Sequence, residues 1–193
     1  MSRSKLHAHR AAIAVLLLGA FASAGCRKDA PSGGRGPSSA AARVDALFLA
    51  EAPVVVPEEI APELDEMGVR RLYVAAASLS AGGQVRSFPP PPARVPRPVL
   101  LVLMGEPGVE GGLRGNAPEA LGEAWASGTT RLVAEAKGWA EVIGVHVHLV
   151  PTAGDAAALA AALGALKSRL PGLTLSVTLR AGAPEGTWKP LAG

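Results

Sequence analysis

Residues 144–179 decide the fold, and they read GVHVHLVPTAGDAAALAAALGALKSRLPGLTLSVTL. The apolar runs 145–150 and 173–179 have the length of strands, and the segment between them has the composition of a helix. Asp155 precedes this helix as an expected N-cap, and a Pro-Gly pair ends it. The expected apolar stripe of the helix consists of Leu159, Leu163, Leu166 and Leu170. A right-handed strand–helix–strand crossover predicts two parallel strands.

The same alternation extends toward the N-terminus. Further strands are expected at 44–50, 70–78 and 99–104, and the last of these is apolar throughout, as in a strand covered on both faces. A helix is expected over 58–67, ended by Gly68. A second is expected from Ala117 to Ile143, with Asn116 as its N-cap. Gly128 is expected to interrupt this second helix, and Thr129 or Thr130 to cap its continuation. Residues 79–98 are expected to be a loop in which four prolines form a stiff connector.

These elements predict an α/β fold, a partial (β/α)-barrel-like domain of about five mainly parallel strands with alternating helices. About 150 residues are available, whereas a complete (β/α)₈ barrel takes about 200 or more. A half barrel leaves sheet edges unpaired, so we expect either self-association or a chain shortened relative to a longer barrel.

The N-terminus has the pattern of an export signal. Arg3, Lys5 and Arg10 give it positive charge, and no acidic residue precedes Asp29. The apolar segment 11–22 is shorter than the roughly 20 residues that span a bilayer, which disfavours a permanent transmembrane helix. We therefore predict that residues 1–25 are a signal peptide.

Cys26 is the expected site of lipidation. Residues 22–26 read ASAGC, which resembles the lipobox of bacterial lipoproteins, although Ser23 stands where leucine is usual. Cys26 is the single cysteine of the chain, so an intramolecular disulfide is impossible. Ordinary cleavage after Ala24 is the alternative and would release a soluble protein. Since residue 27 is Arg rather than Asp, the resemblance implies a periplasmic or cell-surface location, at the outer membrane rather than the inner one.

The rest of the chain is divided into a tether and one domain. Residues 26–43 are rich in Gly, Ser and Pro and are expected to be a lipid-anchored flexible tether, and 44–193 a single α/β domain. Removing the three basic residues of the signal from a total of 19 leaves 16, which equals the 16 acidic residues. The mature chain therefore lacks the basic balance of a nucleic-acid-binding protein.

Residues 144–179 also carry a family resemblance. Three features resemble an uncharacterised family of bacterial envelope proteins with a glycosidase-like barrel: the Gly-Val-His-Val-His-Leu-Val-Pro strand, the helix that ends in Leu-Pro and the Leu-Ser-Val-Thr strand. In that family Gln and two Asp occupy the positions held here by His146, His148 and Val150. The resemblance therefore implies a shortened relative without catalytic carboxylates on this strand.

Two sets of residues could nevertheless carry chemistry. His146 and His148 share one face of a strand, and with Glu106 they could bind a metal, although buried, hydrogen-bonded histidines are the simpler interpretation. Glu51 and Glu106 both follow expected strands and could form the carboxylate pair of a glycoside hydrolase. The Gly-rich run 105–115 matches neither dinucleotide nor P-loop signature and is expected to be a flexible loop, so no cofactor is predicted.

The resulting expectation is an envelope lipoprotein with a non-catalytic domain in a binding or structural role. Its partners would be the membrane, through the lipid, and a glycan or another envelope protein. The alternatives are a glycoside hydrolase that uses Glu51 and Glu106, and a metal-binding protein that uses His146 and His148.

Overall fold

The computed structural model describes residues 46–49, 60–115, 117–149, 152, 154–178 and 185–188, which belong to one compact unit, Arg43–Gly193. The strands are β1 (Ala46–Leu49), β2 (Arg71–Leu79), β3 (Val85–Ser87), β4 (Val99–Gly105), β5 (Val142–His148) and β6 (Thr174–Val177). The helices are α1 (Ala61–Glu66), α2 (Val109–Gly115), α3 (Pro118–Ala136), α4 (Ala156–Ser168) and α5 (Glu185–Trp188). The expected signal, Cys26, the tether and Glu51 lie outside the described residues.

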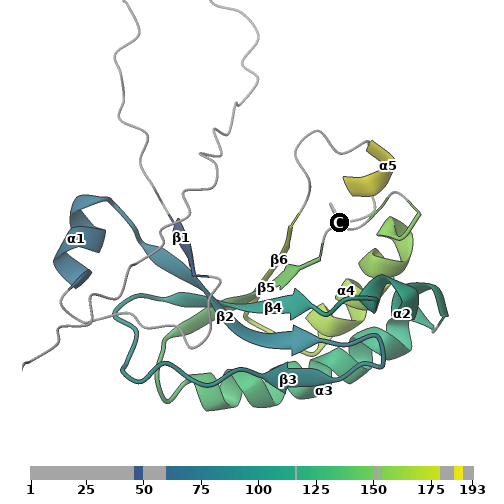
Figure 1. Ribbon diagram of the computed structural model, residues 1–193, viewed down its shortest axis with the longest axis horizontal. Helices are drawn as coiled ribbons and strands as arrows, with labels where there is room; N and C mark the ends of the chain where they lie inside the picture. The colour runs from purple at the N-terminus through teal and green to yellow at the C-terminus, as the bar shows by residue number, and fades with distance from the viewer. Residues whose placement is uncertain are drawn as a thin grey trace, which may run out of the picture. The chain divides into compact units, whose positions relative to one another are not determined.

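Five strands form one parallel sheet in the order β1-β2-β4-β5-β6 (Figure 1). The sixth, β3, pairs antiparallel with the C-terminal end of β2. The prediction of about five mainly parallel strands with alternating helices is confirmed, and so is the parallel pairing of β5 and β6 across α4.

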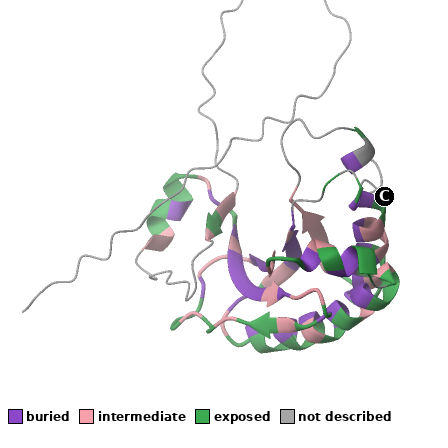
Figure 2. Cartoon of the chain, turned by 45° about the vertical axis from the view of Figure 1, so that its right-hand side comes forward, coloured by how far each residue is buried: buried purple, intermediate pink, exposed green. Residues whose placement is uncertain are grey.

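The helices α3 and α4 pack against one another and cover one face of the sheet (Figure 1). Alternate residues of β4 and β5 point to that side, and Val99, Leu101, Val145 and Val147 are fully buried there. The predicted stripe of α4 is buried as expected. Figure 2 shows that exposed residues concentrate on the outer surface of α3, away from the sheet.

The other face of the sheet is concave. Phe48 on β1 and His148 on β5 are three strand steps apart, which is about 14 Å in a flat sheet with a spacing of 4.7–4.9 Å. Their ring centroids are nevertheless only 5.7 Å apart. The sheet must therefore curve around this face, which confirms the partial barrel-like architecture.

The helix α3 is continuous, so the predicted interruption at Gly128 and the new cap at Thr129 or Thr130 are wrong. The glycine is explained by packing instead, since a Cβ at Gly128 would lie 2.5 Å from Cβ of Val85 on β3. The helix begins at Pro118 with Ala117 as N-cap, and Asn116, the predicted cap, lies outside the described residues.

Three other boundaries differ from expectation. The helix α3 ends at Ala136 and Ile143 lies in β5, so the helix is shorter than the expected 117–143. The run 105–115, expected to be a flexible loop, contains α2. The connector 79–98, expected to be a loop, contains β3. Because β3 runs antiparallel to β2, it leads the chain back toward the start of the parallel strand β4 without a helix. In the part of the chain that the structure describes, no helix has the length and apolarity to cross a membrane.

Candidate ligand-binding site

Four ring side chains meet on the concave face, and we call them the concave cluster: Phe48, Tyr73, His146 and His148. They come from β1, β2 and β5. Strand alternation places them there, because the residues next to His146 and His148, namely Val145, Val147 and Leu149, point to the helices. The prediction that the two histidines share one face, opposite an apolar one, is confirmed.

The rings of the cluster are in contact with one another. Tyr73 and His146 meet edge to face with centroids 5.2 Å apart, and Phe48 stacks on Tyr73 at 6.0 Å. Both arrangements are favourable for aromatic pairs. The ring of His146 is buried, whereas Phe48 is 38% exposed and Tyr73 and His148 are half-buried. One side of the cluster is therefore open to a ligand.

Two hydroxyl groups hold the imidazoles in place. The Oγ of Ser176 lies 2.9 Å from Nδ1 of His146, and the Oγ1 of Thr178 lies 2.9 Å from its Nε2. The same Oγ1 of Thr178 lies 2.8 Å from Nδ1 of His148. The ring of His146 thus has both nitrogens engaged, while Nε2 of His148 makes no hydrogen bond to another described residue.

The buried imidazole is uncharged at neutral pH. Burial, together with the proximity of His148, lowers the pKa of His146 to about 4. A ligand at the concave cluster would therefore meet aromatic faces, hydroxyls and a neutral imidazole.

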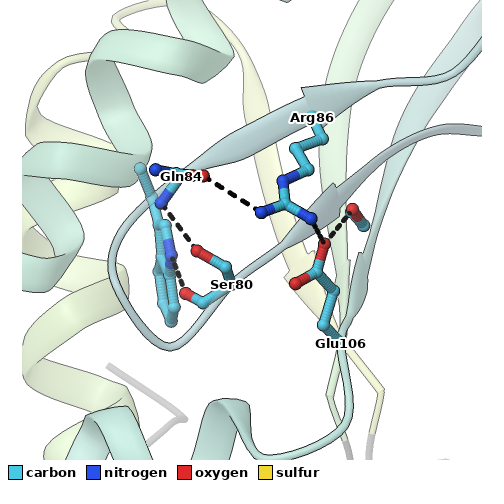
Figure 3. A network of polar contacts seen from close by, with 6 residues as sticks. Ser80, Gln84, Arg86 and Glu106 are labelled. Atoms are coloured by element: carbon cyan, nitrogen blue, oxygen red, sulfur yellow. Dashed lines mark hydrogen bonds and ion pairs between the residues drawn. The ribbon is translucent and has the colours of Figure 1, made fainter.

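Glu106 belongs to a separate network at the C-terminal end of β4 (Figure 3). The hydroxyl of Ser78 donates a hydrogen bond of 2.7 Å to its Oε1, and Nη1 of Arg86 lies 3.5 Å from the same oxygen. Arg86 also donates to Oε1 of Gln84. The structure therefore joins Glu106 to β2 and β3.

The predicted metal ligands are not brought together as a set of three. Within the described ranges, no group of three or more His, Cys, Asp or Glu side chains lies close enough to hold a metal ion. His146 and His148 are in one cluster, but hydroxyl groups occupy three of their four ring nitrogens. The structure does not describe how the proposed glycosidase pair is arranged, because Glu51 lies outside the described residues.

Asp155 was expected to cap α4 with its side chain. It is the N-cap residue, but its carboxylate makes no capping hydrogen bond. The carboxylate is fully buried and accepts hydrogen bonds from Nε and Nη2 of Arg114, at 2.6 and 2.9 Å, and from the hydroxyl of Thr152. These bonds, that from Arg114 first, lower the pKa of Asp155 to about 2. Its role is to join α2 to the start of α4.

Four residues of the site were not recognised in the sequence: Phe48, Tyr73, Ser176 and Thr178. Ser176 and Thr178 carried a usable signal, because Ser176 on β6 and Thr178 directly after it alternate in phase with His146 and His148 on β5. Phe48 and Tyr73 carried none, since only the curvature of the sheet brings β1 and β2 close to β5.

Comparison of the chain with known protein families, with curated proteins and with solved structures finds no match. The site must therefore be interpreted from its own geometry.

Proposed function

We propose that the protein is an exported, lipid-anchored envelope protein that holds a neutral, hydroxyl-rich ligand, such as a glycan, on its concave face without catalysing a reaction. The observation that supports this function is the concave cluster, where exposed aromatic surface lies beside imidazole and hydroxyl groups. Aromatic faces cover apolar parts of such a ligand, and a few fixed polar groups orient its hydroxyls. Nε2 of His148 can donate or accept according to tautomer, which suits a hydroxyl partner.

The charges around the site favour a neutral ligand. His146 is uncharged at neutral pH because its pKa is about 4. The carboxylate of Glu106, which follows β4, already accepts a hydrogen bond from Ser78 and lies next to Arg86. A binding role therefore uses the site as it stands, whereas glycoside hydrolysis needs a second carboxylate opposite the first.

An array of neutral oligosaccharides, followed by calorimetry of the best binder, tests this proposal. We expect Phe48→Ala and His148→Ala each to weaken binding about tenfold, in line with the loss of roughly 1.4 kcal/mol of stacking or hydrogen bonding. Met67→Ala is the matched control, since Met67 is the other exposed large apolar side chain among the described residues. Binding that survives Phe48→Ala and His148→Ala would sink the proposal. Cleavage of the sugar, abolished by Glu106→Gln, would replace it with the glycosidase alternative.

The lipid anchor requires its own test. We expect the mass of the mature chain to include a diacylglycerol on Cys26, and Cys26→Ala to release the protein from membranes. Unchanged processing and membrane association of the variant would mean that no lipid is attached.

A further inference from the structure

A hollow of about 410 Å³ lies between β3 and α3, apart from the concave cluster. Its walls are the hairpin residues 83–86 and the helix residues Ala124, Ser127, Gly128 and Arg131. This volume lies within the range of ligand pockets, about 300–1,000 Å³. The two walls are in direct contact at two glycines, since a Cβ on Gly83 would lie 2.7 Å from Cβ of Ala124 and one on Gly128 would lie 2.5 Å from Cβ of Val85. The hollow is therefore built into the packing of the hairpin on the helix.

One wall of the hollow is an open strand edge. Among the described residues, β3 pairs only with β2. The bonds from Ser80 N to Gln84 O and from Phe88 N to Ala76 O fix the phase of this antiparallel ladder. Residues 84, 86 and 88 therefore direct their backbone groups to β2, and Val85 and Ser87 direct theirs away from it. The outward N–H and C=O groups are the groups that an added strand would use.

The opposite wall carries a cation. Arg131 is exposed on α3 and makes no ion pair or hydrogen bond with another described residue through its side chain. Arg86, which could block the edge, instead reaches Gln84 and Glu106 (Figure 3). A carboxylate that enters the hollow would therefore meet Arg131, whose guanidinium is suited to binding it through two hydrogen bonds.

We propose that the hollow between β3 and α3 binds an extended peptide, which adds a strand to the edge of β3 and places a carboxylate against Arg131. Backbone hydrogen bonds to Val85 and Ser87 provide the affinity in this mode of recognition. The charge on Arg131 selects peptides whose free C-terminal carboxylate reaches that point.

Selection from a library of random octapeptides with free C-termini tests the proposal with the full chain. The decisive variant is Ser87→Pro, which removes an outward N–H but no bond to β2, because proline is tolerated at such edge positions. Ser87→Ala is its control, since it changes the side chain and keeps the N–H. We expect enrichment with wild type and Ser87→Ala, and none with Ser87→Pro.

The peptide selected is then used to test the charge. We expect Arg131→Gln, or amidation of the peptide's C-terminus, to raise the Kd about tenfold, and Lys137→Gln, at an exposed cation just after the end of α3, to leave it unchanged. Amide shifts on binding should be confined to residues 83–87 and 124–131. The proposal would be overturned by equal enrichment with Ser87→Pro, by an unchanged Kd in Arg131→Gln, or by shifts at Tyr73 and His148. It would also be overturned if the edge of β3 paired with a second copy of the chain in sedimentation experiments.

Discussion

The backbone of α3 passes close to that of α4 at Gly122, and this contact yields a sharp test of the packing. A Cβ at this position would lie 2.2 Å from the carbonyl oxygen of Ala162 on α4. Carbon–oxygen contacts between neighbouring backbones are normally about 3.3–3.6 Å, so Gly122→Ala would force the helices about 1 Å apart. The change gains about 1 kcal/mol of helix propensity but incurs an overpacking cost of about 3 kcal/mol. We therefore expect a net loss of about 2 kcal/mol in the free energy of unfolding.

The matched control is Gly164→Ala in α4, where nothing lies within 4 Å of the new Cβ. Only the propensity gain of about 1 kcal/mol applies there, so this variant should be stabilised. Urea unfolding followed by circular dichroism would measure both, and the melting temperature should fall by roughly 4–8 °C in the first variant and rise by roughly 2–4 °C in the second. A rise in both variants would refute the close contact between α3 and α4.

Three other perturbations have defined outcomes. Thr129 has a fully buried hydroxyl without a hydrogen-bond partner, so Thr129→Val should stabilise the protein by about 1–2 kcal/mol in urea unfolding. Thr130→Val should not, because the Thr130 hydroxyl is bonded to Ala126 O, and equal effects would contradict this assignment. Folding lowers the pKa of His146 from 6.5 to about 4, so the unfolded state binds the proton more readily than the folded state. The free energy of unfolding should therefore decrease by up to roughly 3 kcal/mol as the pH falls from 6.5 to 4. A His146→Gln protein that keeps this pH dependence would show that another group causes it. Asp155→Asn should cost about 1–3 kcal/mol at pH 7 and remove the loss of stability that wild type shows as the pH falls below about 3.8. An unchanged urea midpoint would contradict the ion pair between the buried carboxylate of Asp155 and Arg114.

The regular part of the fold could be predicted because its signals are local. Leu159, Leu163 and Leu166 repeat at helical spacing on α4, and alternation along β5 separates His146 from Val145. What the sequence did not reveal depends on contacts between distant segments. In the sequence Gly128 indicates a helix break, and only its contact with Val85 on β3 explains why a glycine stands within α3.

The site was predictable only in part for the same reason. His146 and His148 stand out as an alternating pair, and their face was assigned correctly. Their partners are fixed by strand pairing and by curvature. The register of β5 and β6 places Ser176 beside His146. The curvature of the sheet brings Phe48, on the distant strand β1, to the same ring. No spacing within one segment encodes such an arrangement.

The hydroxyl of Thr178 lies between two imidazole nitrogens, and it has a single hydrogen to offer. If it donates to His148, then Nε2 of His146 must carry a hydrogen and donate to Thr178, which leaves Nε2 of His148 as a donor toward the ligand. If it donates to His146, every direction is reversed and Nε2 of His148 becomes an acceptor. The two rings therefore exchange tautomers as a unit, and one ligand hydroxyl at His148 sets the hydrogen positions as far as Ser176.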